Sequence, residues 1–433
     1  MPSRVYFVRV RGRPRLSVLP NRMFDMGDKL LRPERGENSA LNAVRAAAAF
    51  LVVAGHARGF LFVGREDASG DLLTQGALAL FGLGHGAVLV FFVLSGYFVG
   101  GSVQRSMTRG TFSVTSYAIS RLTRLWIVLI PAILLTAILD WMGRARFGAT
   151  VFYGEESNAF TNSGWLTALG NISFMQPLHV RTFGSNEALW SLTYEAGYYV
   201  IFPLLLAGFF YARRLRVKVL LAAVGLGVIA TFGWSVLSLF PVWLLGAAVA
   251  FRGGSIRSRV SKVPPMVLTA LRVLNLLALV GAMVADKVAG GSPVNAPFTS
   301  YIVGVLAASF VALLLPDLWP RQAAGRQLLR LSSGLAASSY SLYAIHYPLL
   351  VLMAVAVSPG GVTGSWQPSV GSWAGFIAIV VALTTAGWVF SLVTERHTES
   401  ARRRVAALLT VPFRSGAFKR VAGHLWSGRQ SAN

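Results

Sequence analysis

Apolar residues are concentrated in long runs that recur along most of the chain. A helix needs about 20 predominantly apolar residues to cross the hydrocarbon core of a bilayer. Segments of that kind lie at 43–62, 77–100, 125–142, 188–210, 217–235, 237–251, 266–286, 298–315, 335–357 and 372–393. The pattern therefore predicts an all-α, polytopic membrane protein with about ten transmembrane helices.

Composition supports this class. Of the 433 residues, 54% are hydrophobic and only 13% are charged, whereas a soluble domain carries about 25% charged residues. No polar segment is long enough for a fused soluble domain. The chain has no cysteine, which excludes disulfides, thiolate metal sites and a cysteine nucleophile.

Charge distribution predicts the topology. The formal net charge is +24. If the ten segments alternate and both termini are cytoplasmic, 33 of the 40 Lys and Arg residues fall on the cytoplasmic side and six on the other. This is the positive-inside bias, and we expect the basic surface to contact anionic lipids. Nucleic acid is a poor alternative partner, because the charge follows the topology.

The segments outside the membrane differ in character. Residues 1–40 form a basic arm without the apolar core of a cleavable signal peptide. Residues 41–394 form the transmembrane domain, and the basic tail 395–433 resembles an interfacial amphipathic helix. The outer loop 143–187 is long for a connector, so we expect it to be functional.

Arg45 and His56 are the most unusual residues of the first apolar run. They are eleven residues apart, so they share a helix face at a separation of about 16 Å. Ionisable residues inside a membrane helix are costly and usually functional. This pair predicts chemistry within the bilayer.

Three further polar residues are expected at the depth of His56. The helical rise places His56 and Glu195 at about 18 Å above the cytoplasmic edge. His346 is expected at about 16 Å and Ser95 at about 14 Å by the same reasoning. The four side chains should meet in one polar cavity.

Arg121 and Arg124 are predicted to open the third helix at the cytoplasmic rim, on one face with spacing i, i+3. Their guanidinium groups suit phosphate oxygens. A basic rim that includes Arg45, with a His/Glu centre about 16 Å deeper, fits acyl-coenzyme A as co-substrate. No catalytic G-x-S-x-G, P-loop or metal-ligand spacing is present, so no metal is expected.

Structural roles compete with these assignments. Arg121 and Arg124 fit ordinary positive-inside residues, and Arg45 fits a residue that extends to the interface. His346 also fits a buried histidine bonded to a carbonyl, and the Ser95 region fits a small-residue helix contact. Glu195 also fits a brace for its helix. Of these residues, His56 fits a purely structural role least well.

Six motifs, in order, resemble the acyltransferase 3 family of bacterial integral-membrane O-acyltransferases. The resemblance runs from about residue 41 to 404. The motifs are Arg45-x10-His56, Phe-Phe-Val-Leu-Ser-Gly at 91–96, Arg-x-x-Arg at 121–124, Trp-Ser-Leu-x-x-Glu at 190–195, Ser-Tyr-Ser-Leu-Tyr-x-x-His-x-Pro at 339–348 and Thr-Glu-Arg at 394–396. There are two departures from the family pattern: Asn42 stands where an Asp is common, and Tyr194-Glu195-Ala196-Gly197 stands where Val-Glu-Glu-Gln is commoner. The second departure bears on the substrate and not on the reaction.

The resemblance implies an O-acyltransferase of the bacterial inner membrane. Its acyl group, with acetyl favoured, would pass from acyl-CoA to a hydroxyl of a carbohydrate-containing acceptor such as an envelope polysaccharide, a lipid-linked sugar or a lipo-oligosaccharide. His56 and Arg45 match the essential residues, and Arg121 and Arg124 match the acyl-donor motif. His56 would then act either as a general base on the acceptor hydroxyl or as a transient acyl carrier.

The remaining roles are hypotheses. Ser95 is assigned to the donor site, Glu195 and His346 support His56 or bind the acceptor, and Tyr194 and Tyr343 donate hydrogen bonds to the thioester oxygen. Alternatives are a glycan exporter, a scaffold subunit, or O-acylation of a macrolide-type molecule; a homo-oligomer is also compatible.

Overall fold

The computed structural model describes residues 38–148, 150–211, 215–290, 298–316, 334–358 and 362–410. The predicted basic arm, except for its last three residues, and the tail beyond 410 lie outside the described residues. Every described element is helical apart from an isolated parallel bridge between Phe62 and Trp366. The all-α prediction is confirmed.

Seven helices in the described part of the chain are long and apolar enough to cross a membrane. They are α2 (Asn38–Leu61), α4 (Gly84–Thr108), α5 (Val114–Phe147), the second part of α9 (Leu215–Phe251), α11 (Pro265–Val288), α14 (Ser339–Val357) and α15 (Val370–Val393). The other expected segments coincide with α8 (Trp190–Tyr211), the first part of α9 and the shorter α12 (Phe298–Leu313). The chain is a polytopic membrane protein.

Two expected boundaries were wrong. The segment 77–100 is broken, because α3 (Leu72–Leu80) is a separate short helix whose N-cap Asp71 accepts a hydrogen bond from the backbone N–H of Thr74 at 3.0 Å. The third membrane helix begins at 114 and not at 125, with Ser113 as its N-cap. Arg121 and Arg124 therefore lie about 10–15 Å inside the helix and do not open it.

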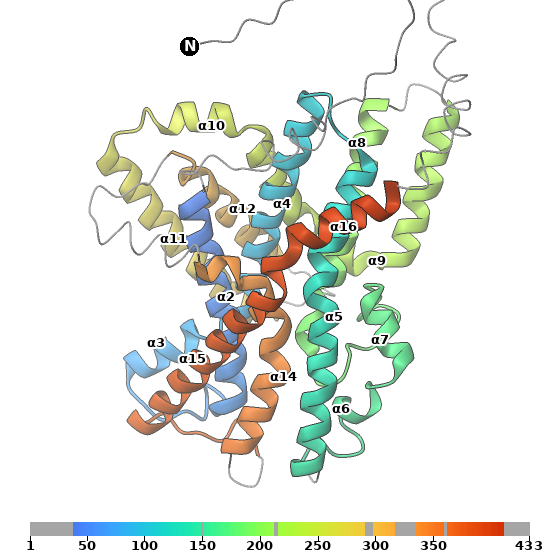
Figure 1. Ribbon diagram of the computed structural model, residues 1–433. Helices are drawn as coiled ribbons and strands as arrows, with labels where there is room; N and C mark the ends of the chain where they lie inside the picture. The colour runs from blue at the N-terminus through green and yellow to red at the C-terminus, as the bar shows by residue number, and fades with distance from the viewer. Residues whose placement is uncertain are drawn as a thin grey trace, which may run out of the picture.

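The shorter elements connect the bundle at its two ends. Helix α10 (Gly253–Val260) lies at the top of Figure 1 with the end of α4, and these segments carry Arg105, Arg109 and Arg257. We call this the basic end. The opposite end, at the bottom of Figure 1, holds α3, α6 (Asn158–Thr161) and the start of α15. We call this the loop end.

Four further elements complete the described chain. Helix α7 (Trp165–Ile172) and the 3-10 turn η1 (Glu187–Leu189) belong to the long loop that precedes α8. After α15, the 3-10 turn η3 (Glu395–His397) leads into α16 (Thr398–Thr410), which crosses the middle of the bundle in Figure 1.

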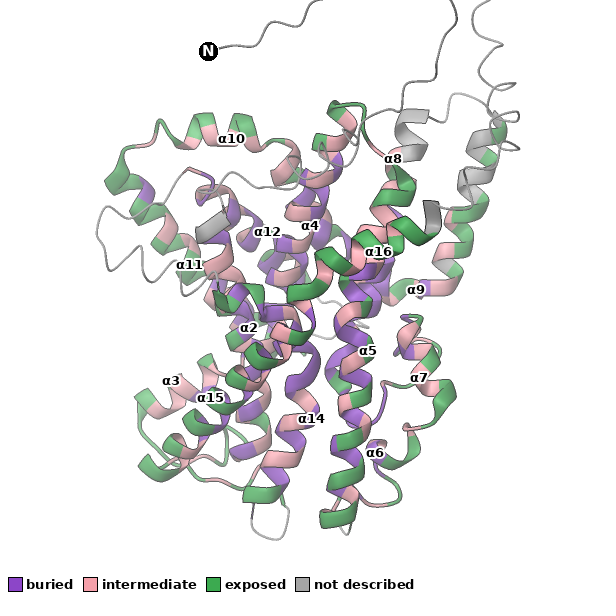
Figure 2. Cartoon of the chain, in the orientation of Figure 1, coloured by how far each residue is buried: buried purple, intermediate pink, exposed green. Residues whose placement is uncertain are grey.

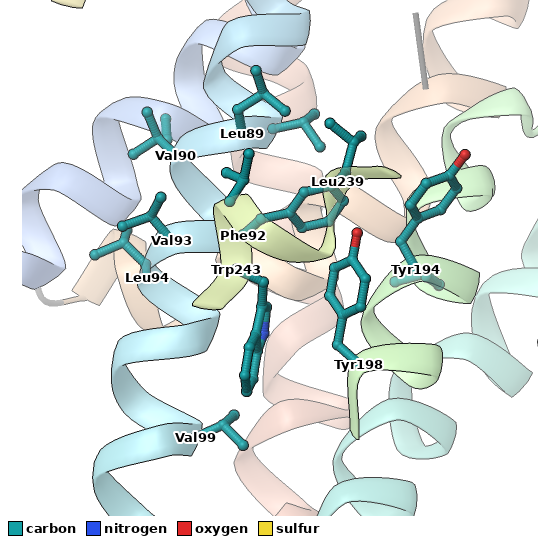
Figure 3. Close-up of a cluster of buried hydrophobic side chains, with 14 of the residues drawn as sticks. Leu89, Val90, Phe92, Val93, Leu94, Val99, Tyr194, Tyr198, Leu239 and Trp243 are labelled. Atoms are coloured by element: carbon teal, nitrogen blue, oxygen red, sulfur yellow. The ribbon is translucent and has the colours of Figure 1, made fainter. Parts of the chain in front are cut away.

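Helices α4 and α9 pack with backbone nearly against backbone. A Cβ on Gly96 would meet the carbonyl oxygen of Trp243 at 1.9 Å, and a Cβ on Gly246 would meet that of Val93 at 1.9 Å. Around this contact Phe92, Trp243 and tyrosines of α8 form the centre of the core (Figure 3). Gly96 thus has the structural role weighed for the Ser-Gly pair.

The periphery carries large apolar side chains. Leu134 and Trp141 on α5, Leu277 on α11 and Ile377 on α15 are all more than half exposed. Figure 2 shows exposed residues alternating with buried ones along α5 and α15, while α14 is buried along much of its length. A contiguous apolar exterior of this kind suits the hydrocarbon core of a bilayer.

Candidate active site

His56 of α2 and His346 of α14 are in direct contact inside the bundle. Nδ1 of His56 lies 2.8 Å from Nε2 of His346, and the ring planes differ by only 11°. The ring centroids are 5.1 Å apart, which exceeds the nitrogen separation by about two ring radii. The rings therefore meet edge to edge, and the shared hydrogen points along the bond.

The hydrogen bonds determine where the protons of the neutral pair lie. Nδ1 of His346 is 2.8 Å from the carbonyl oxygen of Tyr343. A carbonyl only accepts, so this nitrogen carries the hydrogen and Nε2 of His346 has a lone pair. His56 must then donate from Nδ1, which leaves the lone pair of its Nε2 for a reacting hydroxyl. The arrangement is that of an oriented general base.

Pro348 explains how α14 is held at this level. Proline has no N–H, so it leaves the carbonyl of Ala344, four residues earlier, without its helical donor. The side-chain Nδ2 of Asn186 donates to that oxygen at 2.8 Å and is 3.2 Å from Oγ1 of Thr136 on α5. The His-x-Pro spacing thus needs a donor from the loop before α8.

That loop is also fixed to α5 by a carboxylate. The backbone N–H and hydroxyl of Ser185 donate to Asp140 at 2.8 and 2.5 Å. Gly184, with φ of 56°, brings the chain over Asp140, and a Cβ there would lie 2.1 Å from the carboxylate. The following residues, Asn186 and Glu187, are therefore presented to α14 by a rigid turn.

The two tyrosines expected to donate to a thioester have other partners. The Tyr343 hydroxyl donates to the carbonyl of Ala188 at 2.8 Å and accepts from Ser191 at 2.7 Å. Tyr194 lies with Phe92 in the core (Figure 3), with ring centroids 6.0 Å apart. Both were assigned a catalytic donor role that the structure does not support.

Glu195 and Ser95 form a second polar pair. Oγ of Ser95 donates to Glu195 at 3.1 Å and accepts from the indole N–H of Trp243 at 3.2 Å. The hydroxyl of Tyr199 also donates to Glu195. The four residues expected on one level therefore belong to two separate hydrogen-bonded pairs.

Arg45 contacts the beginning of α14. Its Nε donates to Oγ of Ser339 at 2.9 Å, and an Nη donates to the carbonyl oxygen of Ala336. These two hydrogen bonds join α2 to the beginning of α14.

Glu395 of η3 holds the same helix end from the other side. Its carboxylate accepts from the backbone N–H of Ser341 at 2.5 Å, and the hydroxyls of Thr394 and Ser341 are 2.9 Å apart. A carboxylate at a helix N-terminus satisfies an otherwise orphaned N–H. These contacts give the Thr and Glu of the Thr-Glu-Arg motif a structural role, which the sequence alone did not indicate.

Arg124 forms a charged cluster with Arg45, Glu195 and Glu395. Electrostatic interactions join Arg45 and Arg124 to both Glu195 and Glu395. The side chain of Arg124 remains exposed, although α5 packs against α14 along this region, where the Tyr340 hydroxyl donates to the Leu125 carbonyl at 3.1 Å. Arg124 therefore presents its charge inside the bundle without being enclosed.

Arg121 lies between two aromatic rings, 5.6 Å from the centroid of Tyr117 and 5.7 Å from that of Tyr199. Tyr117 in turn donates at 3.1 Å to the carbonyl of Tyr199, which Pro203 leaves without its helical donor. Among the residues that the structure describes, the buried Nε of Arg121 has no hydrogen-bond partner. A buried charged donor of this kind suits an anionic ligand.

All seven sequence-predicted site residues line the interior of one bundle, on α2, α4, α5, α8 and α14. The sequence did not indicate Asn186, Glu187, Asp140 or Glu395 as contributors. The one available signal was Pro348, which implies an unpaired carbonyl but does not identify its donor.

An α-helical membrane bundle with a hydrogen-bonded histidine pair and internal arginines fits an integral-membrane enzyme suited to group transfer. The chain belongs to the acyltransferase 3 family: the family model, described as an acyltransferase domain, matches residues 38–392. No curated protein and no solved structure matches the chain. The resemblance seen in the motifs is confirmed, and the protein is a membrane acyltransferase that uses an acyl donor and an acceptor.

Proposed function

We propose that the protein transfers an acyl group, with acetyl favoured, from acyl-CoA to a hydroxyl of a carbohydrate-containing acceptor in the bacterial inner membrane. The observation that carries the proposal is the His56–His346 contact at 2.8 Å, which leaves Nε2 of His56 as a proton acceptor. Envelope polysaccharides, lipid-linked sugars and lipo-oligosaccharides all offer such hydroxyls.

The transfer step balances with these residues. Nε2 of His56 takes the proton of the acceptor hydroxyl while its oxygen attacks the thioester carbonyl. The C–O ester bond forms, the C–S bond breaks, and the proton on His56 passes to the sulfur of CoA. The positive charge that develops on His56 is shared through its Nδ1–H with His346, whose orientation Tyr343 fixes.

Arg121 and Arg124 are proposed to hold the donor. Arg124 is exposed within the bundle, and Arg121 has a buried donor nitrogen without a described partner. Arginine is the residue best suited to bidentate phosphate contacts. Arg45, whose donors contact Ser339 and Ala336, contributes charge to this donor site and holds α14 in register with it.

Partial exposure supports a path from these arginines to the histidines. Arg45, Glu195, Ser95, Phe91 and His56 are each partly accessible, although they project from α2, α4 and α8, and α4 packs against both of the others. An extended pantetheine arm would pass along these side chains. The donor's charged head and its thioester would then lie at the two ends of the path.

Two variants separate acyl transfer from the alternative of glycan export. In correctly inserted protein, His56→Ala should abolish transfer of label from radiolabelled acetyl-CoA to the envelope glycan. The double variant Arg121→Ala/Arg124→Ala should raise the KM for acetyl-CoA by about tenfold or more, as expected for lost charge-assisted contacts. Arg109→Ala, an exposed arginine at the same basic end, is the matched control. Undiminished transfer by the His56 variant would refute the proposal.

A further inference from the structure

Aromatic side chains extend from His56 toward the loop end of the molecule. The ring of Tyr347 lies 5.1 Å from that of His56 and 5.4 Å from that of Phe60, and Phe60 lies 5.3 Å from Phe152. Tyr347, Phe60 and Phe152 all remain partly exposed. Aromatic rings therefore line the loop-end side of His56.

A carboxylate stands at the far end of the same tyrosine. The Tyr347 hydroxyl donates to Oε2 of Glu187 at 3.0 Å, and Nδ2 of Asn158 donates to Oε1 at 2.8 Å. Glu187 is exposed. Each of its oxygens retains a second lone pair that a ligand hydroxyl can use.

Tyr347 connects His56 to Glu187. Tyr347 contacts His56 with its ring and Glu187 with its hydroxyl, so one phenol side chain separates the base from the carboxylate. One hydroxyl placed at Nε2 of His56 would leave another within reach of Glu187.

The two sides of His56 differ in chemistry. The arginines that suit phosphate lie toward the basic end, with Arg121 near the start of α5 and Arg45 near the start of α2. Glu187 lies in the loop before α8 and would repel a phosphate. The polar and aromatic surface beside Glu187 instead suits a ligand with neutral hydroxyls and an apolar ring face.

We propose that Glu187, Asn158 and Tyr347 form the acceptor site and that it takes a neutral sugar unit with neighbouring hydroxyls, which enters from the loop end. This inference rests on the proposed function. The carboxylate binds a hydroxyl that does not react, and it thereby orients the neighbouring hydroxyl toward His56. Glu187 is thus a binding residue for the acceptor and takes no part in the donor half of the reaction.

The test compares glycan acylation with hydrolysis of radiolabelled acetyl-CoA in the absence of acceptor, where water takes the place of the hydroxyl at His56. Cells that lack the gene are complemented with each variant, and acyl groups on the envelope glycan are measured by mass spectrometry. Purified protein supplies the hydrolysis rate. Glu187→Gln should lower glycan acylation at least about tenfold, as for a lost charge-assisted bond, and should leave hydrolysis within about twofold.

Tyr347→Phe, which removes only the hydroxyl, should lower glycan acylation by less than Glu187→Gln does and should also leave hydrolysis within about twofold. Glu156→Gln, an exposed carboxylate of the same loop, is the control and should change neither. Wild-type glycan acylation by both the Glu187 and the Tyr347 variants would overturn the acceptor site, as would parallel loss of acylation and hydrolysis. Retention of both activities by His56→Ala would instead refute the proposed function.

Discussion

Replacing His346 with alanine tests the proton arrangement at the centre of the site. His346 presents its Nε2 lone pair to Nδ1–H of His56, and the carbonyl of Tyr343 fixes that orientation. Without His346, the His56 ring loses the acceptor that selects its tautomer and its rotation. We expect His346→Ala to lower kcat strongly while the KM for acetyl-CoA changes little, because the arginine cluster is untouched.

The size of the effect follows from the bond that is lost. A buried donor left without its acceptor costs about 1–3 kcal/mol, which corresponds to a decrease in rate of roughly 5- to 150-fold. His56→Ala removes the base itself and should cost roughly 10²–10⁴-fold. His346→Gln, whose side-chain oxygen can still accept from Nδ1–H, should retain more activity than His346→Ala.

The assay is transfer of radiolabelled acetyl to the envelope glycan by membranes with matched amounts of inserted protein. His179→Ala is the control, because this histidine bonds a carbonyl, that of Thr231 at 2.6 Å, outside the site. The double variant His56→Ala/His346→Ala should be no slower than His56→Ala alone, since the two act as one unit. Additive losses, or full activity in His346→Ala, would refute the reasoning.

Three other substitutions test how the site is supported. Asn186→Ala should lower the free energy of unfolding, measured by denaturation in detergent, by about 1–3 kcal/mol. The loss should be smaller in protein that also carries Pro348→Ala, because this change restores an N–H for the Ala344 carbonyl. An equal loss with and without Pro348→Ala would contradict the Asn186–Ala344 hydrogen bond. Glu395→Ala should reduce kcat roughly tenfold through loss of a charge-assisted bond, whereas Glu399→Ala on the neighbouring helix should not, as parallel kinetics would show. Gly96→Ala should lower the thermal midpoint through overpacking worth about 1–3 kcal/mol or more, and an unchanged melting curve would contradict the close helix contact.

Much of the fold was predictable, because membrane-spanning helices require long apolar runs that can be read directly from the sequence. All ten expected segments fall on helices, and the cost of ionisable residues in a bilayer marks the interior positions. Boundaries were less predictable. The polar stretch at 114–124 reads as a loop by hydropathy, but it is helical, and its Arg121 lies 5.7 Å from the centroid of the Tyr199 ring on α8.

Depth along a helix was a good guide to which residues lie inside and a poor guide to which of them touch. The rise per residue places His56, His346 and Glu195 within a few Å of one level. Rotation about each helix axis is decided by packing, and here the Gly96 contact with α9 turns Ser95 toward Glu195. Sequence spacing within one helix holds no information on that choice.

The loop contribution could not be predicted for a different reason. Asn186 and Glu187 follow a glycine turn in a segment without hydropathy periodicity, and their partners on α14 are more than 150 residues away. Glu395 has the same character, since its partner Ser341 is 54 residues earlier. Such long-range polar contacts can be anticipated from the sequence only where a residue such as Pro348 leaves a backbone carbonyl without its helical donor.

The Ala344 carbonyl links the outer loop to the His56–His346 pair. Pro348 leaves the carbonyl of Ala344 without its helical donor, and Asn186 donates a hydrogen bond to it instead. The next residue, Glu187, accepts a hydrogen bond from Tyr347, which precedes Pro348 in the chain. One turn of α14 therefore carries both the histidine that orients the base and the two groups that hold the loop.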